Sequence, residues 1–139
     1  MINLPYSGAT LFTADLTRDV SRTVQCQQAG VSNCLAVKIN YEYLATSVQP
    51  GDSLGFMSGS ALSMKLRRAP SGSSSSSLSY SFSLSDGGEG TVTVRPQTGS
   101  VFASVRPLTG AVMFAVESCG QACTVLYQRD TGYLNQLQD

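Results

Sequence analysis

Apolar and polar residues alternate along much of this chain with the two-residue period of a half-buried β-strand. The clearest case is Leu78–Ser85, in which every second residue is a serine. One face of such a strand packs against a core and the other meets water. The same alternation recurs in six further segments: Val37–Tyr43, Leu62–Leu66, Val92–Val94, Val101–Val105, Val112–Val116 and Val125–Tyr127.

Short alternating strands in this number predict an all-β protein, an antiparallel β-sandwich or barrel, because parallel sheets show continuous apolar runs separated by helical crossovers. Little helix is expected, with room for a turn or short helix only at Asp15–Val24 and Tyr133–Leu137. A chain of 139 residues fits one domain. We therefore expect a single domain over residues 1–139, with a mobile serine-rich loop at residues 69–77 between two strands.

The C-terminal part of the chain contains a short repeat that predicts a β-meander. Val94–Val101 has the sequence Val-Arg-Pro-Gln-Thr-Gly-Ser-Val, and a similar sequence returns eleven residues later at Val105–Val112. In each copy a strand meets a proline, which cannot donate to a ladder, and then a Thr-Gly pair at which the chain can turn. The repeat places Arg95 and Arg106 at equivalent strand ends.

Two further segments are typical of turns. Gln49–Asp52 has proline second and glycine third, the arrangement of a type II turn. Asp86–Gly90 offers two carboxylates and glycine carbonyls, so a calcium loop is an alternative interpretation there. It lacks the regular aspartate spacing of such a loop, which favours a plain hairpin turn.

The composition favours an exported protein and disfavours nucleic acid and membrane partners. Charged residues make up 13% of the chain, against about 25% in typical domains. Nine acidic and nine basic residues give a net charge of zero, so no basic field attracts nucleic acid or a membrane surface. No apolar run approaches the ~20 residues of a membrane span. Met1–Pro5 lacks the pattern of a signal peptide, so export implies a removed leader or another route.

Four cysteines form two pairs that are local in sequence: Cys26 with Cys34, and Cys119 with Cys123. An even count in a chain of this composition favours two disulfides in an oxidising compartment. A zinc site is the alternative, but only Cys119 and Cys123 have the spacing of a zinc knuckle. Local pairing is expected because each bridge then closes a single turn, and the crossed pairings stay open at this point.

No histidine occurs in the chain, which excludes Ser-His-Asp and Cys-His machinery and histidine-bearing zinc sites. The acidic residues are scattered rather than paired for glycosidase chemistry. No Gly-Lys-Ser/Thr segment follows a glycine-rich loop, so a phosphate loop is not indicated. We expect a non-enzyme with no catalytic residues, no bound metal and no cofactor.

Five arginines are candidates for a cationic patch if neighbouring strands align them: Arg67, Arg68, Arg95, Arg106 and Arg129. The default for arginines at strand edges is a solvated face, with the aliphatic stems lying over apolar neighbours.

The order of strands and turns over about Tyr41 to Asp130 is similar to that of a known family. Phe114–Glu117 has a Phe-x-Val-Glu pattern, and Thr124–Leu126 follows it as a last strand. With Gly90–Gly120 and the earlier segments Val48–Phe56 and Leu62–Arg68, this succession resembles the pro-domain of secreted reprolysin-type zinc metalloproteases. The resemblance implies a secreted, non-catalytic module that inhibits or helps to fold such a protease. We expect Arg95 and Arg106 to be its charged contacts, because the repeat places them at equivalent strand ends.

An extracellular structural or adhesive module is the alternative function. Leu78–Ser85 lacks the charges that normally prevent strand edges from pairing. In this hypothesis the partner is a further copy of the chain, joined through strand edges, rather than a protease.

Overall fold

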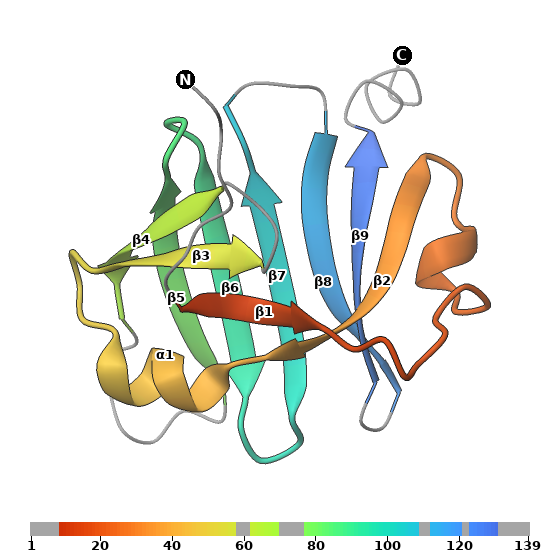
Figure 1. Cartoon of the computed structure of the whole chain (residues 1–139), viewed down its shortest axis with the longest axis horizontal. Helices are drawn as coiled ribbons and strands as arrows, with labels where there is room; N and C mark the ends of the chain where they lie inside the picture. The colour runs from red at the N-terminus through yellow and green to blue at the C-terminus, as the bar shows by residue number, and fades with distance from the viewer. Residues whose placement is uncertain (1–8, 58–61, 70–76, 109–111, 121–122, 131–139) are drawn as a thin grey trace.

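The computed structural model describes residues 9–57, 62–69, 77–108, 112–120 and 123–130. Over these residues nine strands form a closed barrel (Figure 1). The strands are β1 (Thr10–Ala14), β2 (Val31–Ile39), β3 (Ser53–Met57), β4 (Ser63–Arg68), β5 (Leu78–Leu84), β6 (Glu89–Arg95), β7 (Ser100–Arg106), β8 (Val112–Gly120) and β9 (Cys123–Asp130). Two short helices accompany them, α1 (Tyr41–Ser47) and the 3-10 helix η1 (Gln25–Gln27). The all-β prediction is confirmed, with a barrel rather than a sandwich.

The strands from β3 to β9 run as one meander, in which each strand is antiparallel to the next. β9 then pairs with β2, and β1 pairs with both β2 and β3 to close the barrel. The β1–β3 pair is parallel, with Phe12 opposite Met57, which departs from the expectation of antiparallel strands only. Parallel pairing is possible here because β2 and α1 supply a long connection between the two strands.

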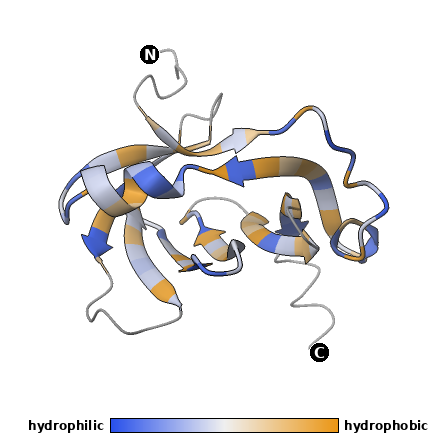
Figure 2. Ribbon diagram, turned by 90° about the horizontal axis from the view of Figure 1, so that it is seen from below, coloured by the Kyte–Doolittle hydropathy of each residue, from blue (hydrophilic) through white to orange (hydrophobic). Residues whose placement is uncertain are grey.

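Buried side chains fill the barrel interior, as is usual in small barrels. Figure 2 shows hydrophobic and hydrophilic residues alternating along the strands. In β5, Tyr80, Phe82 and Leu84 are buried while the serines between them are not. Phe82 is 1% exposed, and Phe114 is partly buried and packs against the same cluster.

A second, smaller apolar cluster lies on the other face of β2, β8 and β9. It comprises Val20, Ala36, Ala115, Val125 and Tyr127, flanked by the four cysteines and Val31. The connection between β1 and β2, which contains η1, supplies Val20 and lies beside β2 in Figure 1. Sequence analysis placed Val125 and Tyr127 on the core face of their strand. Both residues are buried as that pattern predicts, but they pack in the second cluster, while Leu126 between them belongs to the interior cluster.

The helical segments differ from the sequence prediction. The strand expected over Val37–Tyr43 ends at Ile39, and α1 begins at Tyr41. Tyr41, Leu44 and Val48 are spaced at i, i+3 and i+7, the apolar spacing of a helix, and Leu44 and Val48 are buried in the core. Asp15–Val24 forms turns rather than a helix. Tyr133–Leu137 and most of the predicted serine-rich loop, residues 70–76, lie outside the described residues.

Both predicted turns are present. In the first, the Asp52 N–H donates to the Gln49 carbonyl oxygen at 2.9 Å and Gly51 has φ +96°, as a type II turn requires. In the second, which joins β5 to β6, the Gly88 N–H donates to Asp86 Oδ1 at 2.9 Å. In the part of the chain that the structure describes, no helix has the length and apolarity needed to cross a membrane.

Closure of the barrel bears directly on the hypothesis of assembly through strand edges. β5 lies between β4 and β6 and is paired with both, with Phe82 opposite Leu66 on one side and Gly90 on the other. The backbone of Ser81–Ser83 is therefore paired on both sides and is not a free edge. Over these residues the strand cannot pair with another copy. Alternation shows which face of a strand is buried but not which strands flank it.

Candidate functional site

Two disulfides border the second cluster. Cys26 pairs with Cys34 at a Cα–Cα distance of 5.8 Å, and Cys119 pairs with Cys123 at 5.0 Å. This is the local pairing that the spacing predicts, and no cysteine in the described residues is free. The bridged sulfurs are not available as zinc ligands. The described residues also contain no group of three or more His, Cys, Asp or Glu side chains placed to hold a metal ion.

The hairpin of β6 and β7 separates the two arginines that the repeat made equivalent. Arg95 lies opposite Ser100 beside the turn, whereas Arg106 lies opposite Glu89 at the other end of the hairpin. The two positions are six residues apart along an antiparallel pair, roughly 20 Å at ~3.4 Å per residue. The structure therefore does not bring Arg95 and Arg106 together, because equivalent ends of antiparallel strands point in opposite directions.

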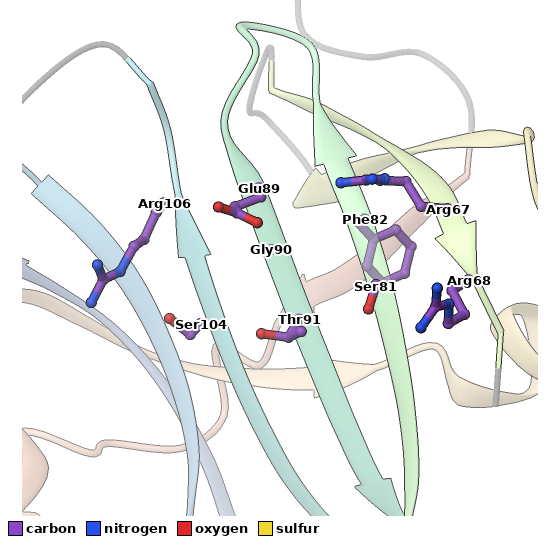
Figure 3. Close-up of a pocket in the computed structure, with 9 residues that line it drawn as sticks. All are labelled: Arg67, Arg68, Ser81, Phe82, Glu89, Gly90, Thr91, Ser104 and Arg106. Atoms are coloured by element: carbon purple, nitrogen blue, oxygen red, sulfur yellow. The ribbon is translucent and has the colours of Figure 1, made fainter.

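Arg106 instead shares a pocket with the two consecutive arginines of β4. This pocket, here called the arginine pocket, has a volume of about 630 Å³. It spans the outer surface of β4, β5, β6 and β7 (Figure 3). Its lining residues are Arg67, Arg68, Ser81, Phe82, Glu89, Gly90, Thr91, Ser104 and Arg106. The volume falls within the range of about 300–1,000 Å³ that is usual for ligand sites.

A β-bulge places both arginines of β4 at this pocket. Leu66 pairs with Phe82 and Arg68 pairs with Ser81, so Arg67 is an extra residue without a partner in β5. Strict alternation would turn one of two consecutive residues toward the core, yet both arginines are exposed. The sequence does contain a signal for this bulge, which was missed. Arg67 and Arg68 directly follow the alternating Leu62–Leu66 segment, and neither charge could be buried without a partner.

The hollow follows a row of small side chains across the barrel wall. Ser81, Thr91, Ser104 and Ala115 are direct register partners on β5, β6, β7 and β8. The row begins at Arg68 on β4 and ends at Tyr127 on β9. On β7, Ser104 lies between the larger side chains of Phe102 and Arg106, which are the next residues on the same face of the strand. The short side chains of the row therefore leave a depression in the outer wall.

A second pocket continues the depression toward β9. It has a volume of about 430 Å³ and shares Thr91, Ser104 and Arg106 with the arginine pocket. We call it the tyrosine pocket after Tyr127. Its other lining residues are Thr93, Phe102, Ala103, Met113, Ala115, Val116, Glu117, Tyr127 and Arg129. Phe102 is 47% exposed, so the wall presents an aromatic side chain to solvent between polar neighbours.

Tyr127 and Arg129 make the polar contacts of the tyrosine pocket. The Tyr127 hydroxyl donates to Glu117 Oε2. Burial, together with this carboxylate, raises the pKa of Tyr127 to about 12, so the phenol stays a neutral donor at physiological pH. The Arg129 guanidinium carbon lies 5.6 Å from the centre of the Tyr127 ring, and Arg129 Nη2 donates to Gln28 Oε1 at 2.5 Å. Arg129 therefore belongs to the wall but not to the arginine pocket.

Comparisons with known proteins relate the chain to others by fold alone. No family of known proteins matches the sequence, and no curated protein resembles it closely enough to be counted as a relative. One solved structure, described as "Structure of a chaperone-substrate complex", is similar with a TM-score of 0.56. The match covers 90% of this chain and 88% of that one at 9% sequence identity. At this identity the similarity supports a shared barrel fold.

Proposed function

We propose that this chain is a non-catalytic, exported module that binds another protein with the outer wall of its barrel. One observation carries the proposal: the interior is filled by packed side chains, while both pockets described above open on the outer surface of β4 to β9. Arginine and aromatic residues are enriched at protein interfaces. The wall carries three arginines in one pocket and the half-exposed Phe102 in the next.

The chemistry of the two pockets supports a role in binding rather than in catalysis. Each pocket contains a single carboxylate, Glu89 in the first and Glu117 in the second. Neither therefore holds the pair of carboxylates that glycosidase chemistry needs. The chain has no histidine to act as a general base near neutral pH.

Two further observations support an exported module with a protein partner. The two disulfides are consistent with an oxidising compartment, extracellular or periplasmic. The solved structure of similar fold is described as a chaperone-substrate complex, so a barrel of this kind occurs in an assembly of proteins.

The proposed partner is a secreted zinc metalloprotease, on the strength of the resemblance to reprolysin-type pro-domains. In the test, the full chain is added to a purified secreted metalloprotease of that type while hydrolysis of a peptide substrate is followed. We expect saturable inhibition together with retention of the protease on the immobilised chain. The test variant is Phe102→Asp, which changes an exposed side chain of the wall. It should weaken both inhibition and retention without unfolding the barrel.

Two results would contradict this proposal. Equal inhibition by the wild-type chain and Phe102→Asp would place the contact away from the outer wall. Absence of retention, combined with concentration-dependent self-association in sedimentation, would replace the protease by a second copy of the chain.

A further inference from the structure

We propose that the arginine pocket binds an extended acidic peptide segment of the partner, with the peptide carboxylates on Arg67, Arg68 and Arg106. This inference deepens the proposed function and rests on it. It names the chemistry that the outer wall recognises and the part of the wall that does so.

Charge supplies the first argument. The chain as a whole is neutral, yet three guanidinium groups and one carboxylate, that of Glu89, line this pocket. The three arginines are exposed at their strand positions, so their donors can be reached from solvent. A guanidinium offers parallel N–H donors that match a carboxylate in a bidentate pair. The pocket is therefore complementary to an anion with planar, paired oxygens.

The hydroxyl groups between the arginines supply the second argument. Ser81, Thr91 and Ser104 lie on successive strands, and neighbouring strands are about 4.8 Å apart. Each hydroxyl both donates and accepts hydrogen bonds. The path from β4 to β7 spans three strand intervals, about 14 Å, the length of roughly four residues of extended chain. A peptide crossing the strands can thus place carbonyl and N–H groups along this row while its carboxylates meet the arginines.

The adjoining tyrosine pocket favours a peptide over a sulfated glycan, the other polyanion that an arginine cluster attracts. Phe102 and Met113 offer apolar surface there, which suits an apolar side chain following the acidic ones. Glu89 also disfavours dense sulfate charge inside the pocket but can accept a peptide N–H.

The repeat provides a matched pair of variants for the test. Arg106→Gln removes a guanidinium from the pocket, whereas Arg95→Gln makes the same change in the same Val-Arg-Pro setting at the far end of the hairpin. The probe is a fluorescent peptide of glutamate and leucine residues, and the control peptide has glutamine in place of glutamate. Anisotropy measures binding to the full chain, and thermal unfolding confirms that each variant remains folded.

We expect Arg106→Gln and Arg68→Gln each to weaken binding of the acidic peptide about tenfold, since a charge-assisted hydrogen bond is lost in each. Arg95→Gln should bind as the wild type does, and the glutamine peptide should bind weakly to all variants. Added salt should weaken binding of the acidic peptide, because the contacts are partly solvent-exposed ion pairs.

Three results would overturn the inference. Equal losses of peptide binding for Arg95→Gln and Arg106→Gln would mean that the peptide responds to the overall positive charge and does not bind at the arginine pocket. Binding of a heparin fragment in preference to the acidic peptide would assign the pocket to sulfated glycans. Inhibition of the metalloprotease that is lost in Phe102→Asp but unchanged in Arg106→Gln would leave the proposed function standing and remove the arginine pocket from it.

Discussion

Gly88 lies directly against the backbone of Arg106. A Cβ built at Gly88 would stand 2.2 Å from the Arg106 carbonyl oxygen and 2.7 Å from the Leu108 nitrogen. The turn between β5 and β6 is therefore pressed onto the chain where β7 ends. The φ of Gly88 is not in the left-handed region, so glycine is needed at this position for close approach of the two backbones rather than for an unusual backbone conformation. This contact fixes the strand end that carries Arg106 into the arginine pocket.

Gly88→Ala should therefore destabilise the protein by roughly 1–3 kcal/mol, the usual range for an inserted methyl group that forces backbone to shift. Gly90→Ala is the matched control on the same side of β6. The nearest atom to a Cβ at Gly90 is the Val105 side chain at 3.4 Å, an ordinary contact. Urea-induced unfolding of the two variants measures the difference. Equal stabilities would mean that the turn and the end of β7 separate without cost.

Phe82 and Phe102 provide a second comparison, between two phenylalanines on the meander. Phe82 is 1% exposed in the interior cluster and Phe102 is 47% exposed on the outer wall. Truncation of Phe82 to alanine should cost roughly 3–5 kcal/mol. Phe102→Ala should cost less than about 1 kcal/mol, because much of its surface is already in water. Calorimetric unfolding of both variants tests this, and a cost at Phe82 as small as that at Phe102 would reverse the assigned strand faces.

Reduction of the disulfides should loosen the second cluster before the barrel unfolds. Thiol titration of the unfolded, unreduced protein should find no free cysteine, since both bridges are formed. The bridges close short loops, with separations of 8 and 4 residues, so chain entropy predicts about 2 kcal/mol from each.

Hydrogen exchange measured after reduction should show early loss of protection in η1 and the adjoining part of β2. The β5–β6 hairpin should stay protected, because it packs on the interior cluster. Simultaneous loss in both regions would contradict the separation of the two clusters.

The strands were predictable from sequence where only one face is apolar. Leu78–Ser85 shows this, since its serines leave a single way to place the strand against the core. Val125–Tyr127 does not, because Leu126 lies between two other apolar residues, and alternation cannot choose between two buried faces. The break between Ile39 and Tyr41 was hidden for a similar reason: Tyr41 and Tyr43 continue a strand pattern while Tyr41 and Leu44 begin a helical one.

The candidate site was less predictable than the fold. The arginine pocket draws on β4, β5, β6 and β7, so it depends on strand order and register, which local patterns do not specify. Arg95 and Arg106 show the limit most clearly: the repeat makes them equivalent in sequence, but antiparallel pairing sends them to opposite ends of a hairpin. The bulge at Arg67 was also outside the two-residue period on which the strand predictions relied.

The last prediction concerns stability at high pH. Burial raises the pKa of Tyr80 to about 12 with help from Tyr41, and burial with the Glu117 carboxylate does the same for Tyr127, from an ordinary value of 10.0. Above pH 10 the unfolded chain loses these protons while the folded protein keeps them. The stabilisation is thus complete below pH 10 and declines as the pH rises toward 12, by at most about 1.4 kcal/mol per pH unit for each tyrosine.

Tyr127→Phe isolates the contribution of one of these two tyrosines to the pH dependence of stability. Phenylalanine keeps the ring in the second cluster but has no proton to lose, so the free energy of unfolding should fall less steeply between pH 10 and 12 than in the wild type. Urea-induced unfolding at several pH values measures the two slopes, and phenolate absorbance counts the tyrosines that ionise late in the folded protein. Parallel slopes for variant and wild type, or ionisation of every tyrosine near pH 10, would show that Tyr127 is not shielded by burial and Glu117.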